Sequence, residues 1–411
     1  MPLEPESIGT LADLLHQDPP PKELEITILP FPDDNDTSSF MKDGIHLGIH
    51  APHVPKLARE FRKFYYGSRS AAISNGEHND TDRNKLMDCV SCLLLLCPDH
   101  ATAWADRRRL LLQREELSIT SSLSSWETEI GFLNMLFTQH SKAPNAWGHR
   151  RWVCRQILKT LKDNYIQESS DRLIKWATYE IAVCTVIAEK YPKNYYAWTH
   201  RSFIIRELVD MMQRDNGLHD DDIRAMLQAE VETIEPWLLR HVSDHSAAHY
   251  GGEVLLLWLK VGKDESSMDD VDWKIETMQE KLQTSRDLID KFPSHEVIWI
   301  WRRICSRLLL DCYPYRPNDN DDSSITLESM VSFLQKEILY TSSMIETCFS
   351  SSNDKDDINH QNFSSAYALW ILSYAKRIIN LDTSLIMEDI STIKASLGEN
   401  NAAIANEAFI K

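Results

Sequence analysis

The sequence predicts an all-α fold, an α-solenoid in which pairs of helices stack in series. Two observations predict it. A short motif with a tryptophan near its start recurs along the chain at an almost constant pitch. Before each copy stands a long stretch, such as residues 171–190, in which apolar residues recur at helical spacing. Each repeat therefore contributes one helix before the motif and a second helix that the motif opens.

Four copies of the motif are clear, and each places an arginine three residues after its tryptophan. These pairs are Trp104 with Arg107, Trp147 with Arg150, Trp198 with Arg201, and Trp299 with Arg302. A worn copy carries Ala248 and Gly251 in the same places, and a weak sixth copy ends at Trp370. The anchor positions 104, 147, 198, 248 and 299 give steps of 43, 51, 50 and 51 residues. Tetratricopeptide arrays repeat at about 34 residues and are excluded.

The anchor tryptophans are expected in the core, because a large aromatic side chain at helical spacing is usually buried. The arginine three residues later lies on the same helix face. We expect its guanidinium to lie over the indole or to donate to carbonyls of the neighbouring loop. Both residue types are thus predicted to be structural.

The turn before each anchor is the candidate functional region, because solenoids bind ligands along a rim or concave edge. Proline stands six residues before three of the anchors, at Pro98, Pro192 and Pro293, and marks helix initiation. The polar and aromatic residues that we single out in these turns are Lys142, Lys193, Asn194, Tyr195 and Tyr196.

Composition narrows the function classes. The chain has 411 residues and a formal net charge of -18, which disfavours binding to nucleic acid or to anionic membranes by charge attraction. No apolar run is long enough to insert into a membrane and the N-terminus is acidic, so a cytoplasmic protein is expected. The eight cysteines lie mostly in apolar helical segments, and no disulfides are expected.

Zinc binding in this chain is disfavoured. Cys89, Cys92, Cys97 and His100 offer four ligands. However, the spacer 93–96 consists of four leucines, which is typical of a buried helix rather than a zinc knuckle. We expect no metal and no cofactor in this chain.

Three regions are predicted along the chain. Residues 1–83 form an N-terminal extension that is partly flexible and contains some helix. Residues 84–380 form the repeat solenoid, and residues 381–411 form a C-terminal helical tail.

The segment 192–201, with its relatives at 98–108, 144–153 and 293–303, resembles the repeat of the protein prenyltransferase α-subunit family. The phrases 241–250 and 292–299 are most similar to the branch of α-like subunits of geranylgeranyltransferase type III. The resemblance implies a right-handed superhelix of helical hairpins. It also implies a heterodimer with a prenyltransferase β subunit, namely that of Rab geranylgeranyltransferase.

In this family the β subunit holds the catalytic zinc, so the resemblance implies zinc in the partner. It also implies geranylgeranyl diphosphate as co-substrate. The protein substrate is expected to carry a C-terminal cysteine, as a farnesylated SNARE does. Lys142 matches the family lysine near the diphosphate, and Lys193 offers a second cation at the same repeat position. Asn194, Tyr195 and Tyr196 keep two residues of the family pattern Asn-Tyr-His and are implied to bind substrate. Pro144 departs from the family tyrosine.

Two alternatives stay open. The chain could be a non-enzymatic helical adaptor that kept the repeat but lost the chemistry, as the worn copy at 248–251 suggests. It could also be an ordinary Rab geranylgeranyltransferase α subunit, although it lacks the strand-rich and leucine-rich additions that some of those chains carry. A stand-alone enzyme is disfavoured because no nucleophile with its base, no phosphate-binding glycine loop and no metal cluster is present in the sequence.

Overall fold

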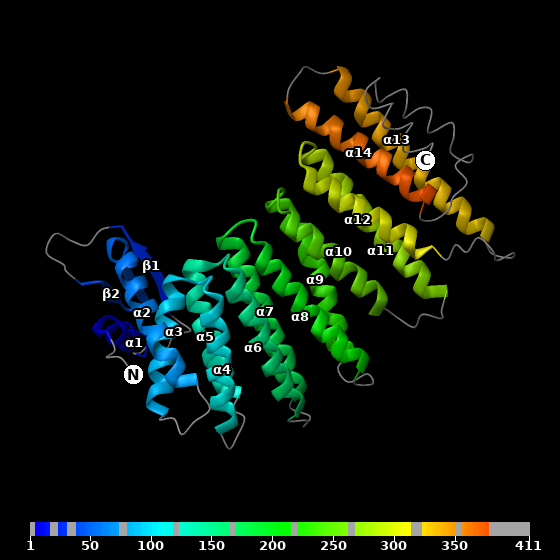
Figure 1. The fold of residues 1–411 in the computed structure, drawn as a ribbon. Coiled ribbons are helices and arrows are strands. Elements are labelled where there is room, and N and C mark those ends of the chain that lie inside the picture. Colours follow the sequence, from blue (N-terminus) through cyan, green and yellow to red (C-terminus); the bar gives the residue numbers. More distant parts are fainter. Residues whose placement is uncertain are drawn as a thin grey trace. The chain divides into compact units, whose positions relative to one another are not determined.

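The computed structural model describes most of the chain, and Figure 1 shows its helices and strands in sequence order. The described residues are 5–16, 24–30, 38–73, 80–117, 123–163, 169–214, 220–261, 268–313, 323–350 and 355–377. Two compact units, residues 1–204 and 205–411, divide the chain within helix α8. The predicted C-terminal tail, 381–411, lies outside the described residues.

The first unit begins with α1 (Glu6–His16), followed by strands β1 (Glu25–Leu29), β2 (Phe40–Asp43) and β3 (His46–His50). After the short helix η2 (Ala51–His53) come α2 (Val54–Ile73) and the repeat helices. These are α3 (Asp80–Leu96), α4 (Ala101–Leu117), α5 (Leu123–His140), α6 (Pro144–Asp163), α7 (Ser169–Lys190) and the start of α8 (Tyr195–Arg214). The second unit holds the rest of α8 and then α9 (Asp220–Arg240), α10 (His245–Val261), α11 (Met268–Lys291), α12 (Glu296–Cys312), α13 (Ser323–Ser350) and α14 (Lys355–Arg377).

The structure confirms an all-α repeat fold, with six helix pairs among the described residues running from α3/α4 to α13/α14. In the five pairs from α3/α4 to α11/α12 a short turn joins the two helices, and the residue four positions before the anchor caps the second helix in several of them. Asn194 Oδ1 accepts from the Ala197 amide at 3.2 Å, and Asp244 Oδ1 accepts from the Ala247 amide at the same distance. The predicted prolines lie within the turns and do not begin the helices. Asn194 caps α8 after Pro192, whereas His295 before α12 makes no side-chain cap hydrogen bond. The handedness of the superhelix stays a prediction.

The N-terminal extension contains a small sheet that the sequence analysis missed. Its strand order is β1-β3-β2, with β1 parallel and β2 antiparallel to β3. Leu47 and Ile49 of β3 are fully buried, and the Ile26 amide of β1 donates to Thr138 Oγ1 of α5 at 2.9 Å. The extension contains helices α1 and α2, as expected of a partly helical segment, and this sheet packs it against the first repeats.

The sixth copy of the motif has a different register from the expected one. Tyr367 Oη donates to Glu337 Oε2 at 2.6 Å, just as Tyr250 donates to Glu230 in the worn copy. Tyr250 lies two residues after its anchor position, so the equivalent anchor in the last pair is Ser365 and not Trp370. The long interval between α12 and α14 concealed this register.

Candidate functional site

The anchor tryptophans fasten each turn to the helix that follows it. Trp104, Trp147 and Trp299 are buried. The indole Nε1 of each donates to the backbone carbonyl six residues earlier, at 2.7 Å for Trp104, 2.8 Å for Trp147 and 3.1 Å for Trp299. Trp198 is buried in the same way. One side chain therefore fixes both the core and the geometry of the turn.

The arginines three residues later bind carboxylates, which the sequence analysis did not foresee. Arg150 Nε and Nη2 donate to the two carboxylate oxygens of Glu180, each at 2.8 Å. Arg107 pairs in the same two-pronged way with Glu129, and Arg302 with Glu337. Each bridge joins the second helix of one pair to the first helix of the next pair. The expected position over the indole is found at Arg201, whose guanidinium carbon lies 5.4 Å from the Trp198 ring centroid. Arg302 also donates to the Leu282 carbonyl, but this carbonyl lies within helix α11 and not in the neighbouring loop.

A histidine two residues after the anchor completes two of these clusters. His149 Nε2 lies 2.7 Å from Glu129, and His200 Nε2 lies 2.8 Å from Glu180. Burial alone would raise the pKa of Glu180, but the Arg150 charge and the His200 hydrogen bond outweigh it and lower the pKa to about 2. Burial lowers the pKa of His200 itself, so this imidazole is neutral near pH 7.

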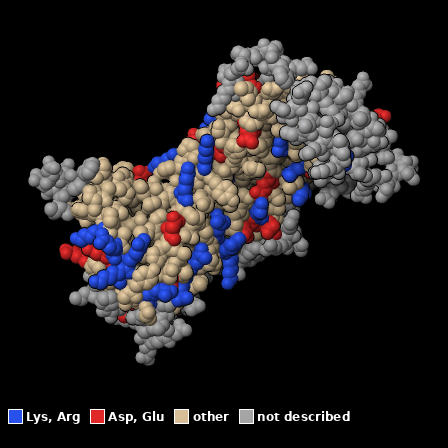
Figure 2. Space-filling model, turned by 45° about the horizontal axis from the view of Figure 1, so that its top comes forward, with Lys and Arg blue, Asp and Glu red and all other residues tan. Residues whose placement is uncertain are grey.

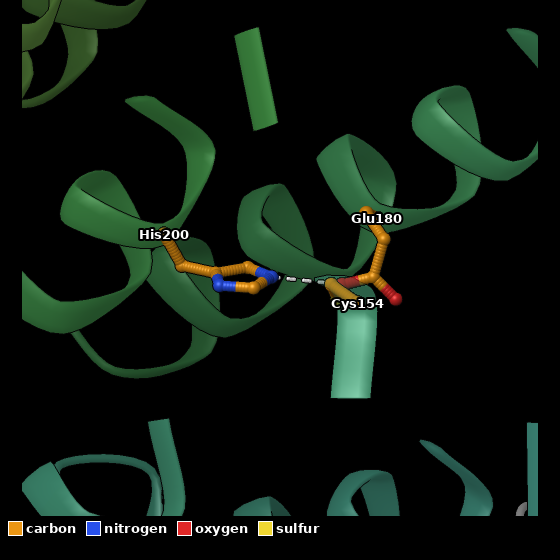
Figure 3. A group of neighbouring side chains, drawn as sticks. All are labelled: Cys154, Glu180 and His200. Carbon is orange, nitrogen blue, oxygen red and sulfur yellow. Dashed lines mark hydrogen bonds and ion pairs between the residues drawn. The ribbon is translucent and has the colours of Figure 1, made fainter. Parts of the chain in front are cut away.

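Cys154, Glu180 and His200 come from α6, α7 and α8 and lie close enough together to suggest metal ligands (Figure 3). Their chemistry does not fit a metal ion. Both oxygens of Glu180 already accept from Arg150, and burial raises the pKa of the Cys154 thiol and keeps it protonated. The guanidinium therefore supplies the positive charge that a metal would supply, and the group is structural. In the parts of the chain that the structure describes, no other group of histidine, cysteine and acidic residues has metal-site spacing.

The two predicted lysines lie on neighbouring exposed turns of the first unit. Lys142 Nζ donates to the carbonyl of Pro192 at 3.2 Å, which brings its ammonium to the residue next to Lys193. Lys193 is exposed and has a φ of 59°, the one non-glycine residue of the described chain with a positive φ. Two cations therefore share one stretch of the rim.

The three residues after Lys193 differ in accessibility. Tyr195 is 61% exposed, and its ring meets that of the half-buried Tyr196 edge-on at 5.6 Å. Asn194 is fully buried, and its Nδ2 donates to the Ser141 carbonyl at 2.9 Å. The side chain of Asn194 thus holds this turn to the preceding one, and only the tyrosines are open to a ligand.

Pro144, the departure from the family pattern, begins α6, where the missing amide hydrogen costs no hydrogen bond. The next residue, Asn145, donates from Nδ2 to the Asp99 carbonyl at 3.1 Å. Side chains thus link the first turn to the second and the second to the third.

The worn copy has no arginine bridge and contains another ion pair instead. In this pair the first helix of the next helix pair, α11, carries the positive charge and not the carboxylate. Glu235 precedes Gly251 by 16 residues, as Ser91 precedes Arg107. Glu235 Oε2 accepts from Lys281 Nζ of α11 at 3.1 Å. The loss of the arginine is therefore compensated by two charged residues elsewhere in the sequence.

None of the described helices is long and apolar enough to cross a membrane.

Residues 126–157 and 178–208 match the protein prenyltransferase alpha subunit repeat family. The chain is 30% identical over 250 residues to protein prenyltransferase alpha subunit repeat-containing protein 1 of Danio rerio, and 28% identical over 254 residues to the Homo sapiens protein of that name. These alignments cover 54% of this chain, and 54% and 58% of those proteins, so the chain spans about half the length of these curated relatives. It is also 26% identical over 151 residues to the geranylgeranyl transferase type-2 subunit alpha of Mus musculus, covering 36% of this chain and 24% of that one.

Proposed function

We propose that this chain, which carries protein prenyltransferase α-subunit repeats, is the α-like subunit of a heterodimeric protein geranylgeranyltransferase. The supporting observation is the rim on which Lys142 reaches the turn of Lys193, because two lysines on contacting turns suit a diphosphate leaving group. The partner is a β subunit, of the kind found in Rab geranylgeranyltransferase, and it supplies the zinc and the isoprenoid pocket. We place the complex in the cytoplasm.

In this proposal the chain has two tasks. Its helix pairs hold the β subunit, and its exposed turns help to bind geranylgeranyl diphosphate and the protein substrate. Lys142 and Lys193 offset the charge of the departing diphosphate, while Tyr195 and Tyr196 contact the substrate. Asn194 acts by holding their turn in place. The substrate carries a C-terminal cysteine that becomes S-prenylated, and a farnesylated SNARE is our candidate.

The first test is co-expression of the chain with a Rab geranylgeranyltransferase β subunit, followed by purification and a geranylgeranyl transfer assay. A one-to-one complex that transfers the lipid to a cysteine-terminated protein supports the proposal. A complex without transfer, on any such substrate, would favour a non-enzymatic adaptor, the second candidate. Absence of a complex would contradict the heterodimer itself.

A second test concerns the two lysines. The double substitution Lys142→Ala with Lys193→Ala should slow prenyl transfer roughly 10-fold or more, because two cations near the leaving group are lost. Folding should be unchanged, since both side chains are exposed, and we expect the heterodimer to assemble as it does with the wild-type chain. The matched control is Lys159→Ala with Lys175→Ala, which removes the same charge from exposed positions outside the turns. Equal single-turnover rates for the double variant and the control would remove these lysines from the mechanism.

A further inference from the structure

The second helices of three repeats carry an arginine immediately after the core arginine. These arginines are Arg108, Arg151 and Arg303, four residues after their anchors. All three are half-buried, and burial lowers the pKa of each. Two of them lie over a tryptophan of the next pair, Arg108 at 5.5 Å from the Trp152 ring centroid and Arg303 at 5.3 Å from Trp370. The same arrangement thus occurs once in each unit.

Arg151 differs from Arg108 in its hydrogen bonding. Arg108 Nε donates to His149 Nδ1 at 3.2 Å. The equivalent acceptor for Arg151 is Nδ1 of His200, yet this atom is buried and has no partner among the described residues. Arg151 Nη1 is likewise buried without a partner there. The hydrogen bond that the arginine and the histidine form between Arg108 and His149 is therefore not formed between the equivalent residues Arg151 and His200.

A third arginine extends this surface. Arg155 is exposed, and its guanidinium lies 4.9 Å from the Phe203 ring centroid. After burial, the charge of Arg155 is the main influence that lowers the pKa of Arg151, so the two guanidinium groups repel each other. We call Arg108, Arg151, Trp152, Arg155 and Phe203 the arginine–aromatic face; it lies on α4, α6 and α8 within the first unit.

Physical chemistry predicts an anion on this face. A half-buried guanidinium loses hydration, and only a hydrogen-bonded counter-charge offsets that loss fully. No salt bridge of Arg108 or Arg151 with a carboxylate is found among the described residues, although the chain as a whole carries a net charge of -18. Lys and Arg side chains are also more prominent than Asp and Glu on the surface drawn in Figure 2.

We propose that the arginine–aromatic face is a docking surface for an acidic patch of the partner protein. Arginine and tryptophan are the residues most enriched in the energetic centres of protein interfaces. Carboxylates of the partner would bind Arg151 and Arg155, while apolar side chains cover Trp152 and Phe203. The identity of the partner, a prenyltransferase β subunit, rests on the proposed function.

The experiment measures the affinity of the full-length chain for the β subunit at several salt concentrations. Arg155→Glu is the main variant, because its exposed position tolerates a carboxylate, and Arg151→Gln is the second. We expect Arg155→Glu to weaken binding at least 10-fold and both variants to flatten the salt dependence. Lys175→Glu on α7, an exposed residue outside the face, makes the same charge change and should leave the affinity within twofold of wild type.

The outcomes separate the two proposals. If the wild-type chain does not bind the β subunit, the proposed function fails. If wild type binds and both arginine variants, folded by circular dichroism, bind equally well, the docking surface is overturned while the heterodimer stands. Restoration of the Arg155→Glu complex by an Asp→Lys or Glu→Lys substitution on the β subunit would confirm the contact. The docking surface would also be overturned if the arginine variants lost binding to anionic vesicles or to RNA while their affinity for the β subunit stayed unchanged.

Discussion

At the scale of single residues, the bridge between Arg150 and Glu180 is the most buried ionic contact of the described chain, with both side chains fully inaccessible to water. Removing one member leaves an uncompensated charge in the core. Arg150→Met should therefore destabilise the protein by about 3 to 5 kcal/mol. Urea unfolding followed by circular dichroism measures the loss.

The partner substitution tests this interpretation. Adding Glu180→Leu to Arg150→Met removes the stranded carboxylate, and much of the lost stability should return. Lys175→Met, an exposed control, should change the unfolding midpoint little. A double variant that is less stable than Arg150→Met alone would show that the ionic bridge itself, and not the avoidance of an unpaired charge, stabilises this packing.

At the scale of helices, the worn copy shows how two helices approach closely where the arginine is missing. A Cβ atom on Gly251 would lie 2.5 Å from Cγ2 of Ile234 and 3.0 Å from Cζ3 of Trp301, both of which are buried. Gly251→Ala should cost about 1 to 3 kcal/mol because α10 must move away from α9 and α12. Thermal unfolding measures the effect.

A matched glycine lies in another second helix. A Cβ atom on Gly148 of α6 meets nothing within 4 Å, so Gly148→Ala should stabilise the protein by roughly 0.5 to 1 kcal/mol through the better helix propensity of alanine. Equal effects of the two substitutions would contradict the close packing of α10.

The helix pairs could be predicted from sequence because tryptophan, turn and arginine recur at fixed offsets. The carboxylates were not predicted, because Glu129, Glu180 and Glu337 follow their arginines by 22, 30 and 35 residues. Loops of different length separate the pairs, so these offsets vary. Counted to the anchor that follows, however, Glu129 and Glu180 precede Trp147 and Trp198, respectively, by 18 residues, a regular spacing that could have revealed them. The sheet was missed for another reason, since strands of four or five residues give little periodic signal.

In the candidate site, neighbouring residues of one motif differ in how far their side chains are exposed to solvent, and the sequence does not show this difference. The sequence places Asn194 beside Tyr195, but one caps a helix from within the core and the other faces solvent. The contact of Lys142 with the next turn depends on the stacking of pairs 50 residues apart. Such contacts between repeats are invisible to a motif that describes one repeat.

At the scale of the whole molecule, the two units should respond differently to acid. In the first unit, the charges of Arg107 and Arg150 overcome burial and lower the pKa of Glu129 and Glu180 to about 2. The unfolded chain takes up these protons near pH 4.3 and the folded chain only near pH 2, so stability falls as the pH drops through this window. Each carboxylate contributes up to about 3 kcal/mol of this loss.

Histidines whose pKa is lowered by burial lie in both units, His149 and His200 in the first and His360 on α14 in the second, whereas Glu235 on α9 responds in the opposite direction. Burial lowers the pKa of His149 and His200, so stability already begins to fall below about pH 6.5, where the unfolded imidazoles become charged. In the second unit burial raises the pKa of Glu235, so this group favours the folded state at low pH and loses that contribution as the pH rises through its folded pKa. We expect hydrogen exchange at about pH 3, inside the window set by Glu129 and Glu180, to show opening in α5–α7 before α9–α12. Glu180→Gln should reduce the difference, and simultaneous opening of both units in the wild-type chain would contradict the assignment of acid sensitivity to Glu129 and Glu180.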